Sequence, residues 1–358
     1  MIADPAVFDD EHLPRRLLHR EAAVDHLSRA WEPALGGDQA HDVLIHGPPG
    51  VGKTALTRHS LRKLTGHADV QTAHVRCLGK TTAGVVRSVL HDLPGSDPSV
   101  NVPREDLCIQ LQERVTSPVI VVLDEADGLP STDALDRLVD VENLSVVVIC
   151  HDPDEWLSRL DGRLRRQLSF AEFGLDRYHV DELADILEAR ANLGLPSESV
   201  TREQLETIAD EVAGVARNGI QALRQAALRA EELQHDRITN EDVSESFERA
   251  KRHIRELNLD SLPFHHQVLY ELIRMGDGLG AGELHDRYDA VADRAYRGRE
   301  QTPISERGRR TKLSKLEEYD LIEVEGENRH RVYQVCDDDV GALDDLNWTF
   351  ENSPCRRL

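Results

Sequence analysis

The chain has 358 residues, a length that predicts two or three domains with buried cores. Its net charge is −23, and only six of its 43 basic residues are lysine, so arginine provides most of the positive charge. The five cysteines are odd in number and scattered, so the sequence indicates neither a disulfide framework nor a zinc site and fits a reducing cytoplasm. The first residues are acidic, and no apolar stretch is long enough to span a membrane, so we expect neither an export signal nor a membrane partner.

A complete phosphate-binding loop, Gly-Pro-Pro-Gly-Val-Gly-Lys-Thr, occupies residues 47–54. The apolar residues 43–45 before it predict a buried strand, and residues 55–64 predict a helix after it. A glycine-rich turn that only connects two elements is the alternative, but strand, loop and helix occur in the order that phosphate binding requires. The sequence therefore predicts an ATP site in which Lys53 reaches the phosphates and the Thr54 hydroxyl binds Mg²⁺. The predicted nucleotide-binding residues of this loop are Gly47, Gly50, Val51, Gly52, Lys53 and Thr54.

A second motif begins with the continuous apolar run at residues 119–123, which predicts a strand buried on both faces of a parallel sheet. The run ends in Asp124 and Glu125, at the strand end where ligands bind in open α/β sheets. We expect Asp124 to hold Mg²⁺ together with Thr54, and Glu125 to orient or deprotonate the attacking water. The alternative is that these carboxylates only form a solvated turn.

The rest of the chain predicts three domains. A further buried-strand run at residues 146–150 leads into His151, and alternating strands and helices predict a doubly wound parallel sheet over residues 1–173, an α/β fold. Helical periodicity then predicts an all-α lid over residues 174–257. The pattern breaks near residues 258–263, so the third domain is placed at residues 258–358.

In the third domain, Thr302 and Pro303 predict the start of a helix that continues to about Tyr319 and is rich in basic residues. Two alternating segments, residues 321–324 and 331–335, follow it and predict a two-stranded ribbon. Helices followed by such a ribbon predict a winged helix whose basic helix enters the major groove of duplex DNA. The predicted DNA-binding residues are Arg307, Arg309, Arg310, Lys312, Arg329 and Arg331. The alternative is a solvated helix face on a winged helix that binds protein.

The order of these parts resembles the AAA+ ATPases of the archaeal origin-recognition and cell-division-cycle initiator family. The resemblance covers nearly the whole chain and rests on Val-Phe-Asp-Asp-Glu at residues 7–11, Leu-His-Arg-Glu at residues 18–21, the phosphate loop, and Leu-Asp-Glu-Ala-Asp-Gly-Leu at residues 123–129. The acidic, lysine-poor composition is similar to that of halophile proteins, whose self-repulsion is screened by salt; an ordinary acidic cytosolic protein is the alternative.

The resemblance implies further site residues. Arg163, in Asp-Gly-Arg at residues 161–163, matches the arginine finger, and Arg217, in Gly-Val-Ala-Arg at residues 214–217, matches sensor 2. Tyr178 and Arg190 match lid positions that contact the nucleotide. His151 stands where the family usually has asparagine at sensor 1, which puts the hydrolysis rate in doubt more than nucleotide binding. The alternative for His151 is that it is only a hydrogen-bonded residue at a strand end. The alternative for Arg163 is that it belongs to a surface ion-pair network.

The functional expectation is an ATP-dependent replication initiator that binds double-stranded origin DNA and hydrolyses ATP slowly as a switch. Loading of the replicative helicase, and self-association on DNA, are expected from the resemblance alone. Residues 77–93 match the helix that meets DNA in relatives, although their own pattern predicts a packing helix. Two alternatives stay open: a winged-helix transcription regulator of the signal-transduction ATPase class, and a DNA-binding module with structural, non-hydrolysed ATP.

Overall fold

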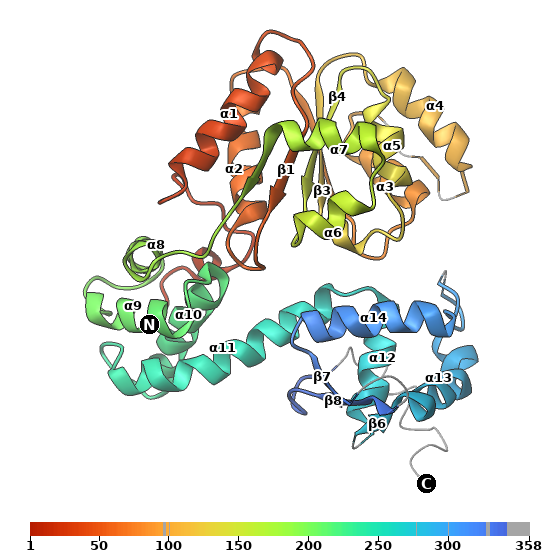
Figure 1. The fold of residues 1–358 in the computed structure, drawn as a ribbon. Helices are drawn as coiled ribbons and strands as arrows, with labels where there is room; N and C mark the ends of the chain where they lie inside the picture. Colours follow the sequence, from red (N-terminus) through yellow and green to blue (C-terminus); the bar gives the residue numbers. More distant parts are fainter. Residues whose placement is uncertain (96–97, 100, 277, 300, 327–329, 342–358) are drawn as a thin grey trace. The chain divides into compact units, whose positions relative to one another are not determined.

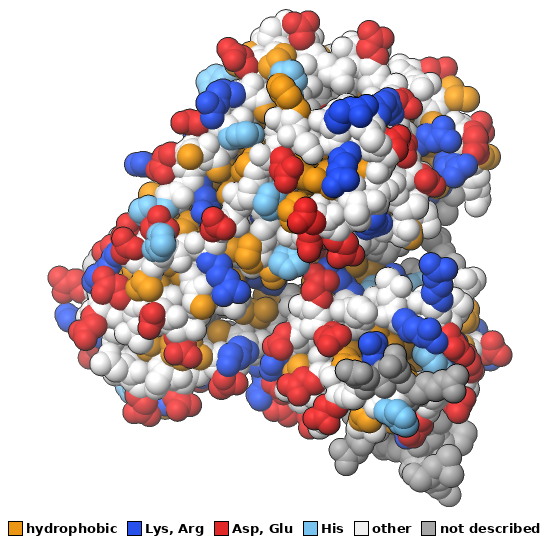
Figure 2. Space-filling view, viewed as in Figure 1, with side chains coloured by type: hydrophobic (Ala, Val, Ile, Leu, Met, Phe, Trp, Pro, Cys, Tyr) orange, Lys and Arg blue, Asp and Glu red, His pale blue; other side chains and the backbone are white. Residues whose placement is uncertain are grey.

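The computed structural model describes residues 1–358 except 96–97, 100, 277, 300, 327–329 and 342–358 (Figure 1). These residues form two compact units, residues 1–246 and 247–358. No helix among them is long and apolar enough to cross a membrane. On the face seen in Figure 2, aspartate and glutamate side chains are spread over the surface with arginine and lysine among them. The net negative charge is therefore distributed and does not form one acidic patch on this face.

A five-stranded parallel sheet with the order β2-β3-β4-β1-β5 lies at the centre of the first unit (Figure 1). Every residue of β3 and β4 is buried, as their continuous apolar runs predict. This sheet confirms the doubly wound fold expected from the sequence. Its strands are β1 (Val43–His46), β2 (Gln71–Arg76), β3 (Val119–Asp124), β4 (Leu144–Ile149) and β5 (Glu172–Gly174).

Helices cover both faces of the sheet, each over its own hydrophobic core. Ile120 and Val122 of β3 pack in the core with helices α1 and α2, whereas Val121 and Leu123 pack in the core with α3 to α7. Alternate residues of one strand thus serve two cores, which is why the strand is apolar without interruption. The helices are α1 (Glu21–Leu35), α2 (Lys53–Thr65), α3 (Thr82–Asp92), α4 (Arg104–Arg114), α5 (Asp133–Val139), α6 (Pro153–Ser158) and α7 (Gly162–Leu168).

The helical lid follows the sheet in the chain. Leu183 and Leu187 are buried on one helix and Leu223 and Ala227 on another, as their helical spacing predicts. The lid helices are α8 (Val180–Gly194), α9 (Arg202–Glu211), α10 (Ala216–Glu232) and the start of α11 (Asn240–Ser261).

Residues 1–12, here named the N-terminal strap, run along the lid. The Ala3 and Asp4 N–H groups donate to the Gly194 carbonyl at 2.9 and 3.3 Å. Phe8 is fully buried, and a Cβ at Gly194 would lie 2.5 Å from its ring, so only glycine fits there. The Gln221 amide donates to the Phe8 carbonyl at 2.9 Å. The strap is therefore part of the folded lid, which the helical pattern of the lid did not predict.

The second unit has the helix and strand order of a winged helix, with a three-stranded antiparallel sheet ordered β6-β8-β7. The prediction that the basic helix starts at Pro303 is wrong, because α14 begins at Glu306 and the Ser305 hydroxyl caps it by accepting from the Gly308 N–H. The elements are α12 (Phe264–Arg274), β6 (Leu279–Gly280), α13 (Ala281–Ala295), α14 (Glu306–Glu318), β7 (Ile322–Glu325) and β8 (Val332–Val335).

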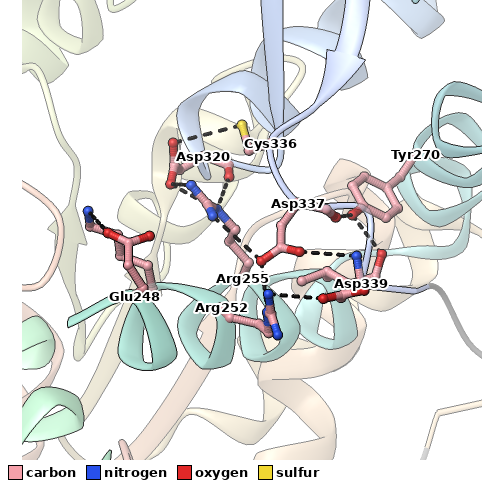
Figure 3. Close-up of polar contacts among 10 residues, drawn as sticks. Glu248, Arg252, Arg255, Tyr270, Asp320, Cys336, Asp337 and Asp339 are labelled. Atoms are coloured by element: carbon pink, nitrogen blue, oxygen red, sulfur yellow. Dashed lines mark hydrogen bonds and ion pairs between the residues drawn. The ribbon is translucent and has the colours of Figure 1, made fainter. Parts of the chain in front are cut away.

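Ion pairs hold the last turns of α11 within the second unit (Figure 3). Arg252 pairs with Asp337 at 2.9 Å and with Asp339 at 3.0 Å, and Arg255 pairs with Asp320 at 2.6 Å. The helix is unbroken from Asn240 to Ser261, so the predicted lid boundary at residue 257 falls inside it. The three-domain division by residue number stays a prediction.

The first turn of α11 depends on one buried carboxylate. Asp242 is fully buried and accepts hydrogen bonds from the Thr239 N–H and hydroxyl, His235 and Arg229. Burial alone would raise the pKa of Asp242, but these donors outweigh it and lower the pKa to about 2. Because the folded-state pKa is depressed, the stabilisation is present above the unfolded pKa near 4 and is lost as the pH falls towards 2.

We predict that Asp242→Asn lowers the free energy of unfolding at pH 7 by about 2 kcal/mol, because an amide cannot accept from all four donors. Thermal unfolding followed by circular dichroism measures the free energy of unfolding. The difference in this free energy between wild type and the variant should become smaller below pH 4. Glu241→Gln is the matched control, because Glu241 pairs with the same Arg229 at 3.0 Å but is exposed. If both variants lowered the free energy of unfolding equally at pH 7, buried Asp242 would not be the carboxylate on which the first turn of α11 depends.

Candidate functional site

The phosphate loop joins the end of β1 to the start of α2. The Lys53 ammonium donates to the loop's own Gly47 and Pro48 carbonyls at 2.6 and 2.9 Å. Burial lowers the pKa of Lys53, although nearby carboxylates oppose the shift. Gly50 and Gly52 have φ of 76° and 94°, a left-handed conformation that lets the loop amides turn inward. The loop is therefore folded as a phosphate cradle with its lysine tied to the backbone.

The two residues predicted to hold Mg²⁺ lie together. The Thr54 hydroxyl at the head of α2 donates to Asp124 Oδ2 at the end of β3, with 2.8 Å between the oxygens. His74 Nε2 of β2 lies 3.0 Å from the same oxygen. Burial favours a higher pKa for Asp124, but the donors His74 and Thr54 prevail and lower it, so the carboxylate stays ionised. Hydroxyl and carboxylate oxygens are the ligands that Mg²⁺ prefers, so this pair fits the metal.

The carboxylate expected to act on water is held by an arginine. Glu125 has φ of 53°, and its Oε1 accepts from Arg76 at 3.0 Å. Its Oε2 is buried with no hydrogen-bond partner among the residues that the structure describes. Arg76 and His74 were not predicted as site residues. The sequence feature that could have identified them is their spacing. They are two residues apart in β2, so they share one face of a strand that pairs with β3, and Arg76 lies opposite Asp124.

His151 follows β4 and reaches the first residue of the phosphate loop. Its ring Nδ1 lies 3.2 Å from the Gly47 carbonyl, which also accepts from Lys53. Its backbone N–H donates to Asp127 at 2.8 Å. The structure thus places His151 beside the loop, and its role towards a phosphate stays a prediction.

Two lid residues border the loop. The Arg217 N–H donates to the Gly50 carbonyl at 3.1 Å, and the Arg217 guanidinium pairs with Asp10 at 2.8 Å. Tyr178 is buried, and the Arg20 guanidinium lies over its ring at 3.8 Å. A Cβ at Gly52 would lie 3.8 Å from the Tyr178 hydroxyl. The fold therefore brings Tyr178 and Arg217 to the phosphate loop.

Arg190 and Arg163 have other surroundings. Arg190 is buried and donates to the Val7 and His12 carbonyls of the strap, and burial lowers its pKa to about 10. Its guanidinium thus holds the N-terminal strap, and the predicted contact with the nucleotide stays a prediction. Arg163 lies on α7 with its side chain 53% exposed and pairs with Asp140 at 2.9 Å. An exposed pair of this kind matches the alternative of a surface ion-pair network, and the arginine-finger role stays a prediction.

The predicted DNA-binding residues divide into groups. Arg307, Arg310 and Arg331 are exposed, Lys312 is half-buried, and Arg329 lies outside the described residues. Burial lowers the pKa of Lys312.

The prediction for Arg309 is wrong, because its side chain is only 6% exposed and its donors are used inside the unit. Its guanidinium pairs with Asp289, lies over the Tyr288 ring at 4.0 Å and donates to the Ile304 and His285 carbonyls. A basic residue counts towards a DNA surface only if its position on the helix faces solvent, and Arg309 lies on the face of α14 that also buries Leu313 and Leu316.

Comparison with known families gives two matches. Residues 16–149 match the AAA ATPase domain, and residues 184–248 match the Cdc6 AAA+ ATPase-type lid domain. These ranges contain the phosphate loop, Asp124 and Glu125 in the first and Arg190 and Arg217 in the second.

Comparison with whole proteins extends the similarity over the full chain. ORC1-type DNA replication protein 9 of Halobacterium salinarum is 32% identical over 94% of this chain and 94% of its own length. ORC1-type DNA replication protein 3 of Haloarcula marismortui is 30% identical over 92% of this chain and 93% of its own. The structure of the Aeropyrum pernix ORC1 protein in complex with DNA superposes with a TM-score of 0.75, 24% identity and coverage of 98% and 97% of the two chains, which shows the same fold. The chain therefore belongs to the family of ORC1-type DNA replication proteins, AAA+ ATPases with a Cdc6-type lid.

Proposed function

We propose that this protein is an ATP-regulated replication initiator that binds double-stranded origin DNA through its second unit. The observation that carries the proposal is the joined Thr54 and Asp124 pair beside a complete phosphate loop, in a chain related over 94% of its length to an ORC1-type DNA replication protein. The A. pernix ORC1 structure is a complex with DNA, which supports DNA as the target, and the winged-helix order of the second unit favours duplex DNA. Helicase loading and a cytoplasmic location remain expectations from the family resemblance and the composition.

ATP·Mg²⁺ is the proposed ligand of the first unit. The loop amides and Lys53 would hold the phosphates, and Thr54 with Asp124 would hold the metal, which supplies charge neutralisation on the phosphate oxygens. Lys53 has to leave the Gly47 and Pro48 carbonyls, and its buried ammonium gains a phosphate partner in exchange. Arg217 would contact the γ-phosphate from the lid, next to Gly50. Arg163 would act on a nucleotide bound by a second copy, which is how we propose that self-association on DNA enters the mechanism.

Hydrolysis is proposed to be slow because Glu125 is engaged. Its Oε1 accepts a charge-assisted hydrogen bond from Arg76 at 3.0 Å, and this contact has to be given up before that oxygen can accept a proton from an attacking water. The alternative of structural, non-hydrolysed ATP draws its support from this contact. A transcription regulator gains no comparable support from the described residues.

The proposed DNA surface is the exposed side of α14, with Arg307 and Arg310, together with Arg331 directly before β8. Contacts to DNA phosphates weaken steeply with salt, with a log–log slope near −0.9 for each neutralised phosphate. If the cytoplasm is as salty as the acidic composition indicates, base-edge and shape contacts have to provide much of the affinity.

Genome-wide mapping of DNA bound by the tagged protein tests the function directly. We expect discrete peaks at replication start sites for wild type and a loss of most of that signal for Lys53→Ala, because the variant cannot hold ATP in the loop. Peaks at promoters would contradict the initiator role and support a regulator.

Release of Glu125 should accelerate hydrolysis. We predict that Arg76→Ala raises the steady-state ATPase rate about tenfold, since loss of a charged hydrogen bond corresponds to about 1.4 kcal/mol, and that Glu125→Gln abolishes it. Arg104→Ala is the control, because Arg104 pairs with Glu105 at 2.9 Å on the surface of the same unit. A rate for Arg76→Ala equal to that of the control would refute the proposed restraint. No activity in any variant would favour structural ATP.

The DNA surface is tested by the double variant Arg307→Ala, Arg310→Ala. Fluorescence anisotropy with duplex DNA over a KCl series should show weaker binding and a log–log slope smaller in magnitude by about two, with unchanged ATP affinity. Arg237→Ala is the control, because Arg237 is an equally exposed arginine of the lid, 68% exposed. Binding by the double variant equal to that of the control would remove this face of α14 from the DNA interface.

A further inference from the structure

The N-terminal strap places a carboxylate on the lid arginine that borders the phosphate loop. Arg217 Nε and Nη2 both lie 2.8 Å from Asp10 Oδ2, although the two residues are 207 positions apart in the chain. The Arg217 side chain is 29% exposed and that of Asp10 is 42% exposed, so the pair lies at the edge of the site and not in the core. The Arg217 N–H donates to the Gly50 carbonyl at 3.1 Å, which places the first turn of α10 beside the phosphate loop.

The strap determines where Asp10 lies. On one side Phe8 is fully buried and its carbonyl accepts from Gln221, and on the other side the His12 carbonyl accepts from Arg190. Asp10 lies between these anchors, so its carboxylate stays near the first turn of α10 without depending on its own ion pair. The entropic cost that weakens most surface ion pairs is therefore reduced for this one.

A carboxylate and a terminal phosphate offer the same chemistry to a guanidinium, namely anionic oxygens that accept from its planar fork of N–H groups. We infer that Asp10 competes with the γ-phosphate for Arg217 and thereby sets how strongly the site prefers a nucleoside triphosphate over a diphosphate. This inference rests on the proposed contact of Arg217 with the γ-phosphate. A triphosphate has to displace Asp10 from Arg217, whereas a diphosphate leaves the pair intact. The N-terminal strap thus acts as a specificity element of the nucleotide site.

The neighbouring Asp9 provides a matched comparison. It pairs at 3.2 Å with Arg224, two helical turns further along α10, and it belongs to the same strap. Replacing Asp9 or Asp10 by asparagine changes the net charge by the same amount. Of these two residues, Asp10 is the one that pairs with Arg217 beside the phosphate loop.

The experiment measures dissociation constants for ATP and ADP, with Mg²⁺, by isothermal titration calorimetry on the full chain. Glu125→Gln is included in every variant, so that ATP is not consumed. We expect Asp10→Asn to strengthen ATP binding about threefold and to leave ADP binding unchanged, the size expected for loss of a partly exposed competing pair. Asp9→Asn should change neither constant. Equal changes for ATP and ADP, or no change for either, would overturn the inference.

The variant Arg217→Ala tests the proposed contact of Arg217 with the γ-phosphate separately from the inferred role of Asp10. If Arg217 contacts the γ-phosphate, Arg217→Ala weakens ATP binding relative to ADP, and adding Asp10→Asn to it has no further effect. If Arg217→Ala leaves the ratio of the two constants unchanged, the proposed γ-phosphate contact is wrong and the inference falls with it. If Arg217→Ala changes the ratio and Asp10→Asn does not, only the role of Asp10 is wrong. Far-ultraviolet circular dichroism confirms that each variant is folded.

Discussion

The hydrogen bond between Thr54 and Asp124 depends on the whole architecture of the first unit. Thr54 is carried by the helix after β1 and Asp124 by the end of β3, and β4 lies between these two strands in the sheet. Parallel strands end at one edge, so the loop, the metal-binding pair and His151 come together there. The sheet needs continuous apolar strands to be buried on both faces, and the helices around it are placed to bury them. A change that shifted the register of β3 against β4 would move Asp124 away from Thr54 and the phosphate loop.

Arginine has two different uses in this lysine-poor protein. Arg309 and Arg190 are buried and satisfy backbone carbonyls with their several N–H donors, and Arg309 also pairs with a carboxylate. Arg307 and Arg310 lie on the exposed side of the same helix as Arg309 and remain candidates for DNA. A guanidinium suits the interior role better than an ammonium because its planar fork reaches several acceptors at once. The number of basic residues in α14 is therefore larger than the number of positive charges that this helix could offer to a DNA duplex, because Arg309 is buried.

The lid connects the nucleotide site to two distant parts of the sequence. Its helix α10 carries Arg217, which bonds the phosphate loop through its backbone and the N-terminal strap through its side chain. The same helix carries Arg229, which pairs with Asp242 at the start of α11. The last turns of α11 are bound to the second unit by Arg252 and Arg255 (Figure 3). Ion pairs thus hold the first turn of α11 within the first unit and its later turns within the second unit.

The amino-acid sequence by itself determined the fold class, the phosphate loop, the Asp124 and Glu125 pair and the family, because each depends on local order, periodicity or a short motif. It also predicted the lid helices and the β7 and β8 ribbon, whose patterns are local. Tertiary structure alone decided which arginines are exposed, because burial of Arg309 depends on Asp289 and Tyr288 of a different helix. It also decided that Arg76 holds Glu125 and that Asp10 holds Arg217, since contacts between residues 49 and 207 positions apart leave no periodic signal in the sequence.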